Sequence, residues 1–108
     1  MIDNIANMYK SFEADRAFAD KALIFKSYPK SIHKKLLRLI NDILTNPRNK
    51  IAIGKPEELK HTKIEKWSRE LTEKDRIVYS IESGIQHNMP YDEEIVIFHQ
   101  YLGHYNDK

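Results

Sequence analysis

The 108-residue chain contains no cysteine, which excludes disulfide frameworks and thiolate metal sites. It has only three glycines, at Gly54, Gly84 and Gly103, so no glycine-rich loop is present to hold a nucleotide phosphate. No apolar run approaches the ~18 residues of a membrane span, and no basic stretch followed by an apolar one opens the chain. The sequence therefore predicts a cytoplasmic protein that makes no membrane contact.

The arrangement of histidines and serines gives no sign of metal or nucleophilic chemistry. The histidines do not pair at the short spacings of zinc motifs, and no cluster of Asp or Glu accompanies them. No serine stands in the sequence context of a nucleophile elbow, which argues against a Ser-His-Asp hydrolase. We therefore expect neither a metal nor a nucleotide cofactor.

Charge is unevenly distributed along the chain, although the formal net charge is only +2. Residues 29–66 carry ten Lys and Arg against four Asp and Glu, a net +6, and the remainder carries eight against twelve, a net −4. A basic middle segment suits a polyanionic partner. It also suits a solvated helix face, which charge alone favours.

Length and patterning predict one domain, residues 1–108, of the α+β class. Residues 5–12 can form a first strand. Apolar residues recur at three- and four-residue steps from Ala14 to Phe25, and Pro29 ends this first helix. A second helix has a clearer apolar stripe and stops at Asn46-Pro47. The stripe consists of Ile32, Leu36, Leu39, Ile40, Ile43 and Leu44.

The second half of the chain is strand-like. Trp67, Arg69 and Leu71 alternate with polar residues, and segments 76–81 and 95–102 are rich in β-branched and aromatic residues. The segment between them, 82–94, reads as a long exposed hairpin loop. The sequence thus predicts two N-terminal helices packed on one face of a twisted antiparallel β-sheet.

Several polar residues of this half have the chemistry needed to cleave RNA without a metal. A ribose 2′-OH attacks its neighbouring phosphate if a base takes its proton, an acid protonates the leaving oxygen and cations stabilise the transition state. Glu57 is the candidate base, Lys60 and Arg76 are candidate charge stabilisers, and His104 is the candidate acid. Arg69 can join the charge clamp or contact the RNA backbone.

Tyr105 is the last candidate, for stacking on a base or orienting the phosphate. Each candidate also has an ordinary explanation as a surface residue. Glu57 in a turn is typical of a solvated acid, Lys60 of an edge-strand lysine, and Arg76 of a surface charge. His104 lies close enough to the C-terminus to be part of a frayed end.

Four blocks of sequence together resemble a known family. GKPEELKH, WSREL, DRIVY and a C-terminal GHY occur in this order, and the first three lie between Gly54 and Tyr79. They are similar to the pattern GKPExLKH, WSRRI, HRLVY and HY of the YoeB/Txe family of bacterial toxins, within the RelE superfamily. The predicted helices and strands fit the layout of that family, so the resemblance covers nearly the whole chain.

The resemblance implies an mRNA endonuclease that acts in the ribosomal A site and inhibits translation. It implies a cognate antitoxin as partner, contact with operator DNA only through the antitoxin complex, and a homodimer as a common state. Carried over by position, the general base of the family falls on Glu57, the transition-state arginine on Arg76 and the general acid on His104. The terminal tyrosine falls on Tyr105, and the supporting basic positions on Lys60 and Arg69.

The chain departs from the family pattern at four places. The second arginine after Trp-Ser is Glu70, the residues before the tryptophan are Glu65-Lys66, the 82–94 hairpin is longer, and three residues follow Tyr105. These departures leave an alternative open, in which a catalytically weakened toxin homologue only binds antitoxin and operator DNA. A third class, a ribonuclease independent of the ribosome, is disfavoured by the modest net charge.

Overall fold

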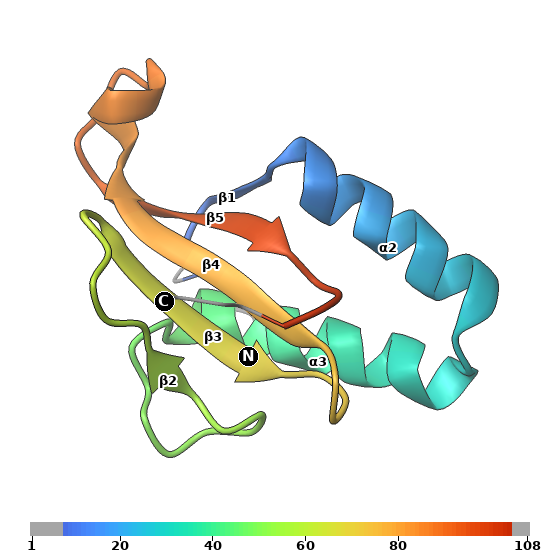
Figure 1. The fold of residues 1–108 in the computed structure, drawn as a ribbon. Coiled ribbons are helices and arrows are strands. Elements are labelled where there is room, and N and C mark those ends of the chain that lie inside the picture. The colour runs from blue at the N-terminus through green and yellow to red at the C-terminus, as the bar shows by residue number, and fades with distance from the viewer. Residues whose placement is uncertain (1–7, 105–108) are drawn as a thin grey trace, which may run out of the picture.

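Two helices cover one face of a five-stranded sheet in the computed structural model, which describes residues 8–104 (Figure 1). The strands lie in the order β1-β5-β4-β3-β2. The predicted α+β class is confirmed. Neither helix is long and apolar enough to cross a membrane. The elements are β1 (Ser11–Glu13), α2 (Asp15–Ser27), α3 (Lys30–Thr45), β2 (Glu57–Glu58), β3 (Glu65–Glu70), β4 (Arg76–Ser83), the 3-10 helix η1 (Gly84–His87) and β5 (Glu94–Gln100).

The sheet is mixed, which corrects the expectation of a wholly antiparallel one. β2 to β5 pair antiparallel, but β1 pairs parallel with β5, with Phe12 opposite Ile97. Parallel neighbours need a crossover connection, and both helices lie in the chain between these two strands. β1 also covers only the end of the predicted strand 5–12 and continues to Glu13, while residues 5–7 lie outside the described part.

Helix α3 forms where its apolar stripe predicts. Leu36, Leu39 and Ile43 are fully buried against the sheet, and Ile32 and Ile40 pack beside them. These positions recur every three or four residues, so one side of the helix faces the core while Lys34 and Arg38 stay in water. The packing holds α3 against the sheet.

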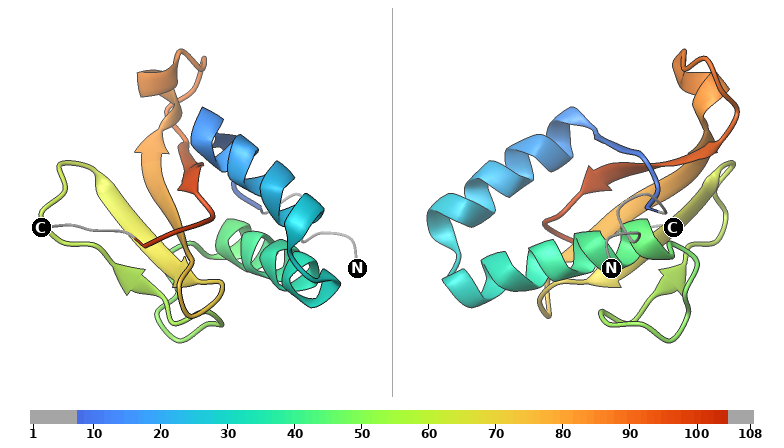
Figure 2. Two further views of the ribbon diagram at one scale, coloured as in Figure 1. Left: turned by 45° about the vertical axis from the view of Figure 1, so that its right-hand side comes forward. Right: turned by 180° about the vertical axis from the view of Figure 1, so that it is seen from behind.

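Helix α2 is predicted correctly as an element, but its spacing does not identify the face that packs. Ala17 and Ile24 are the buried residues, whereas Phe18 is 67% and Phe25 42% exposed. Both rings are thus partly exposed, and that of Phe25 packs edge-on against His33 with the ring centroids 4.8 Å apart. Figure 2 shows both helices on the same side of the sheet.

The two faces of the sheet differ in chemistry because strand side chains alternate. On the helix-covered face, Trp67, Ile77 and Tyr79 belong to the core. On the other side, here called the open face, lie the alternate residues of β3 and β4, among them Ser68 and Arg76. The 82–94 hairpin is more ordered than predicted, since β4 continues to Ser83 and η1 forms its tip, which projects from the sheet (Figure 1).

Candidate active site

Arg76 begins β4 and is held in one orientation on the open face. Its Nε and Nη2 donate to the Ser68 hydroxyl at 2.9 and 2.8 Å, and Nη2 also donates to the carbonyl of Lys55 at 3.3 Å. Ser68 lies on the neighbouring strand β3 and is fully buried. A guanidinium fixed by two of its nitrogens keeps its rigid fork in place, which suits recognition of a phosphate.

Glu57 lies beside this guanidinium. It belongs to the short strand β2 and is paired in register with Ser68, the same residue that holds Arg76. Its Oε1 is 3.7 Å from Nη2 of Arg76, and the Glu57 side chain is 66% exposed whereas that of Arg76 is 20% exposed. The site therefore offers an accessible carboxylate next to a largely covered cation.

The C-terminal segment reaches the same end of the sheet. The backbone N–H of Arg76 donates to the carbonyl of Gly103 at 2.8 Å. The Gln100 side-chain amide donates to the carbonyls of Leu102 and Gly103, at 3.1 and 3.3 Å. His104, which is exposed, follows directly. The predicted acid thus stands one residue from a backbone contact with the predicted transition-state arginine.

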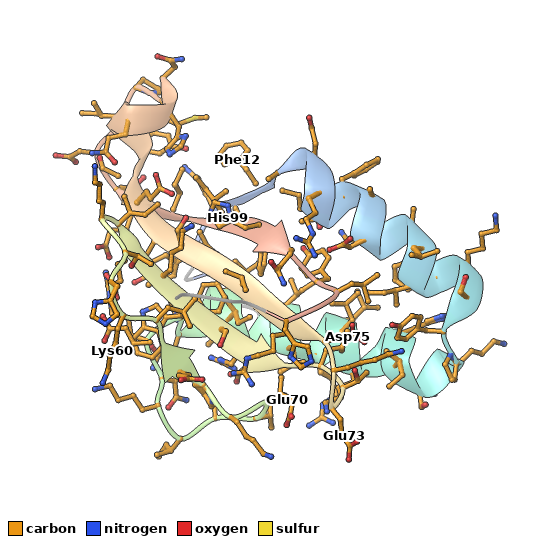
Figure 3. The ribbon with its side chains drawn as sticks, in the orientation of Figure 1. Phe12, Lys60, Glu70, Glu73, Asp75 and His99 are labelled. Atoms are coloured by element: carbon orange, nitrogen blue, oxygen red, sulfur yellow. The ribbon has the colours of Figure 1, made fainter. Side chains whose placement is uncertain are left out.

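Lys60, another predicted site residue, does not join this group. Lys60 is exposed in the loop after β2, near Lys66, whose carbonyl accepts from the Leu59 N–H at 2.9 Å. Figure 3 shows Lys60 beside β2 and Asp75 at the far end of the strands. Tyr105 lies outside the described residues.

Arg69 lies on the helix-covered face, and the predicted RNA contact does not fit this position. The side chain is fully buried, and its Nη1 donates to Asp42 at 2.7 Å and to the carbonyl of Ile53 at 3.1 Å. Alternation with Trp67 and Leu71 already places Arg69 on the core face of the strand. Arg69 therefore joins β3 to helix α3 and to the loop before β2, and we exclude it from the RNA-contacting set.

Glu70, the departure from the family pattern, is close to the site. It is the register partner of Arg76, and its Oε1 lies 3.3 Å from the Lys55 ammonium. The acid is thus matched by a lysine next to the site, and Arg76 keeps its contacts with Ser68 and Glu57. The second arginine of the pattern is replaced here by a Glu70–Lys55 pair.

A second polar cluster lies further along the open face. The Ser80 hydroxyl donates to Glu82 at 2.5 Å, and Nε2 of His99 lies 2.8 Å from the same hydroxyl. Nε2 of His87 lies 2.7 Å from Glu82, and Lys66 is the register partner of Ser80. Burial and the charge of Lys66 lower the pKa of His99 below its ordinary value, and the ring is therefore neutral near pH 7. No group of His, Asp and Glu within residues 8–104 is arranged to hold a metal ion.

Ser68 is the site residue that sequence reasoning missed. A serine in a strand carries no chemical signal of its own. The sequence does predict the sheet face on which Ser68 lies, because strand alternation places it opposite Trp67 and Arg69. Its pairing with Glu57 and its bonds to Arg76 depend on strand register, which the sequence alone does not determine.

Two helices on one face of a five-stranded sheet, with Glu57 and Arg76 3.7 Å apart at one end of the other face, define a small α+β protein with a charged surface site. Comparison with known proteins identifies the family. The model of the YoeB-like toxins of bacterial type II toxin–antitoxin systems matches residues 13–105. The chain belongs to this family.

Individual relatives agree with this assignment. The chain is 40% identical to Toxin YoeB of Escherichia coli K12 over 62 residues. This matched segment covers 57% of this chain and 71% of the relative. A YoeB/ParE toxin from Agrobacterium tumefaciens superposes with a TM-score of 0.71 at 25% identity, over 89% of this chain and 99% of that one. A YoeB dimer from Staphylococcus aureus has the same fold, with a TM-score of 0.69 at 24% identity, over 91% and 99%.

Proposed function

We propose that this toxin is an endoribonuclease that cleaves mRNA in the ribosomal A site and so inhibits translation. The observation that carries the proposal is the grouping at one end of the open face. Arg76 is fixed by Ser68, its guanidinium lies 3.7 Å from Glu57, and its backbone N–H holds the residue before His104. These are the three chemical roles that 2′-OH attack on a phosphate requires.

Each of the three residues has one role in this mechanism. Glu57 takes the proton of the 2′-OH, because its carboxylate is accessible and stands beside the phosphate-binding cation. The 2′ oxygen attacks the adjacent phosphorus, and the P–O bond to the 5′ oxygen breaks. His104 gives that oxygen a proton, which leaves a 2′,3′-cyclic phosphate on one fragment and a 5′-OH on the other.

Arg76 stabilises the negative charge that develops on the phosphate oxygens. Two of its nitrogens are already oriented by Ser68, so little reorganisation is needed when the charge appears. Lys60, outside the group, contributes to RNA binding from the loop after β2. Tyr105 stacks on a base or orients the phosphate, as the family position implies. No metal or other cofactor takes part in this scheme.

The partners follow from the family. One structural neighbour is a heterotetrameric YoeB-YefM toxin-antitoxin complex from Staphylococcus aureus, with a TM-score of 0.67. We infer that this chain has a cognate antitoxin, that it reaches operator DNA only within that complex, and that it forms a homodimer. Its substrate complex is the ribosome with mRNA in the A site, in the cytoplasm.

Cleavage mapping in a purified translation system tests the proposal. The toxin and its His104→Ala variant are compared with ribosomes present and absent, and the 5′ ends of mRNA fragments are mapped by primer extension. Cuts within the A-site codon that require both ribosomes and His104 support the proposal. Cuts in naked RNA would instead indicate a ribonuclease independent of the ribosome.

The non-catalytic alternative has its own outcome in this experiment. Glu70, opposite Arg76 in register, is the observation that keeps it under consideration. A folded toxin that binds its antitoxin but makes no cut with ribosomes would be a binding module. The proposed roles of Glu57, Arg76 and His104 would then be wrong for this chain.

A further inference from the structure

The backbone just before His104 is held by two carboxylates that are distant in sequence, one on helix α2 and one in the turn before β4. The N–H groups of Tyr101 and Leu102 both donate to Oδ2 of Asp20 on helix α2, at 2.8 and 3.1 Å. The next N–H, that of Gly103, donates to Oδ1 of Asp75 at 2.8 Å. Three consecutive backbone donors are thus taken by side chains more than 25 positions away, at a point where the chain has left strand β5.

The carbonyls of the same segment are also bound. Arg16, one turn before Asp20 on α2, donates to the Leu102 carbonyl at 2.8 Å. The Gly103 carbonyl accepts from the N–H of Arg76 at 2.8 Å. Gly103 has a φ of +87°, which residues with side chains rarely adopt, so glycine lets the chain turn here while its N–H and carbonyl are both bound.

Asp75 is itself fixed from two further directions. It is 3% exposed, and its Oδ2 accepts from the hydroxyls of Tyr28 and Thr72, at 2.9 and 2.7 Å. Tyr28 follows the end of α2, and Thr72 belongs to the turn that joins β3 to β4. Burial opposes ionisation of Asp75, but the bonds from Gly103, Thr72 and Tyr28 outweigh it and place the pKa of the carboxyl below its ordinary value.

We propose that Asp20 and Asp75 are positioning residues that hold the Tyr101–Gly103 backbone against Arg76 and thereby place His104 at the reacting phosphate. The inference rests on the proposed function, because the acid role of His104 belongs to it. The two carboxylates act on the mechanism through the backbone and contact no substrate. Asp75 directly precedes Arg76, so one short stretch of chain orients both the transition-state cation and the acid.

The arrangement has a chemical reason. A backbone segment outside a strand has no ladder partners, and left to water it would sample many conformations. Hydrogen bonds to charged acceptors are stronger than those between neutral groups. Ionised carboxylates on helix α2 and in the β3–β4 turn therefore give His104 a defined position without an extra strand or helix.

Asp20→Asn and Asp75→Asn test this role, with Glu73→Gln as the matched control. Glu73 is exposed in the same turn as Asp75 (Figure 3). The control therefore removes the same charge without removing a contact to the Tyr101–Gly103 backbone. The first readout is independent of activity: the ps–ns mobility of the Gly103 and His104 amides, measured by ¹⁵N relaxation. Both Asn variants should show raised mobility there, and the Glu73→Gln control should not.

The second readout is cleavage on ribosomes under saturating conditions. Misplacing the acid should lower kcat about 10- to 100-fold in each Asn variant with KM nearly unchanged. The same substitutions should have almost no further effect in a His104→Ala background, because the acid that they position is already absent. A merely structural role predicts equal losses in both backgrounds.

The outcomes separate the inference from the function on which it rests. Unchanged amide mobility in both Asn variants overturns the positioning role, whatever the activity. Raised mobility with an unchanged kcat, in a protein that does cleave mRNA, also overturns it. A third outcome is that the unmodified protein makes no cut, while the Asn variants still raise the amide mobility of Gly103 and His104. The contacts of Asp20 and Asp75 with the Tyr101–Gly103 backbone would then be supported, and the proposed function would be wrong.

Discussion

One serine determines how the candidate catalytic arginine is presented. The Ser68 hydroxyl accepts from two nitrogens of Arg76, and Ser68 is the register partner of Glu57, so β2, β3 and β4 meet at this residue. The charge of Arg76 is thereby aimed at the open face instead of sampling several rotamers. At the scale of residues, the site depends on this orientation as much as on the identity of the charged groups.

Replacing Arg76 separates its charge from its geometry. Arg76→Ala should lower the rate of ribosomal mRNA cleavage about 10²- to 10³-fold, the usual cost of removing one preorganised charge stabiliser. Arg76→Lys keeps the charge but not the fork held by Ser68, and should recover only a small part of the loss. Single-turnover cleavage measures both. Full activity of Arg76→Ala, in a folded protein, would remove Arg76 from the mechanism.

His99 should make the stability of the fold depend on pH. Its pKa in the folded protein lies below the ordinary 6.5 of the unfolded chain because of burial and the charge of Lys66. Between these two pKa values the unfolded chain binds more protons than the folded protein does. The contribution of His99 to the free energy of unfolding is therefore fully present above pH 6.5. It decreases as the pH falls from 6.5 towards the lower pKa of the folded protein.

Urea unfolding between pH 5 and 8 measures this dependence. The His99→Asn variant should lose part of the slope seen below pH 6.5, and the exposed His61→Asn variant should retain it. Equal slopes in the unmodified protein and the His99→Asn variant would mean that His99 titrates normally in the folded state.

At the scale of elements, the two helices show when apolar periodicity predicts the buried face of a helix and when it predicts only the helix. The stripe of α3 predicts both the helix and its buried side, because Leu36, Leu39 and Ile43 fall on one face. The spacing on α2 predicts a helix but not its packing, since Phe18 and Phe25 remain partly exposed and Ile24 is buried. Spacing specifies a face when one stripe is dominant, and α2 has apolar residues on more than one side.

Two adjacent leucines of α3 provide a matched test of this packing. Leu36 is fully buried and Leu37 is 52% exposed. Leu36→Ala should lower the free energy of unfolding by about 3 kcal/mol, since it removes buried methyl groups and leaves a cavity. Leu37→Ala should change it by less than about 0.5 kcal/mol. Chemical denaturation measures both, and similar losses would show that the orientation of α3 is wrong.

An ion pair between the fully buried Arg69 and the partly exposed Asp42 links the two layers of the molecule. Arg69 from the sheet reaches Asp42 on α3 and the carbonyl of Ile53 in the loop before β2. Its Nε and Nη2 are buried with no hydrogen-bond partner among the described residues, so the guanidinium relies on Asp42 for charge compensation. At the scale of the whole molecule, this contact joins helix α3, the sheet and the loop that leads to Glu57.

Removing the acid of this pair should therefore be costly. Asp42→Ala should lower the free energy of unfolding by about 3 kcal/mol, because a buried charge loses its partner. Glu73→Ala, at an exposed acid, is the control and should have little effect. Urea denaturation of both variants measures the difference. An Asp42→Ala protein as stable as the control would mean that Arg69 is solvated or repartnered.

Sequence reasoning reached the fold class, both helices and the main strands because these depend on local pattern. It also selected Glu57, Arg76 and His104, which the structure brings to one end of the sheet. It offered an RNA contact for Arg69, although alternation groups this residue with Trp67 and Leu71 and the structure buries its side chain. The contacts of Asp20 and Asp75 with the C-terminal segment join residues far apart in sequence, and no local pattern encodes them.

A single 2′-deoxy substitution in the mRNA tests the central claim most directly. The cleaved nucleotide is first mapped on ribosomes, and its 2′-OH is then replaced by hydrogen while the rest of the message is unchanged. The account predicts that cutting at that position disappears, because the attacking oxygen is gone, while the ribosome still presents the codon. Cleavage at an unchanged rate would show that the 2′-OH is not the nucleophile and would contradict the roles assigned to Glu57, Arg76 and His104.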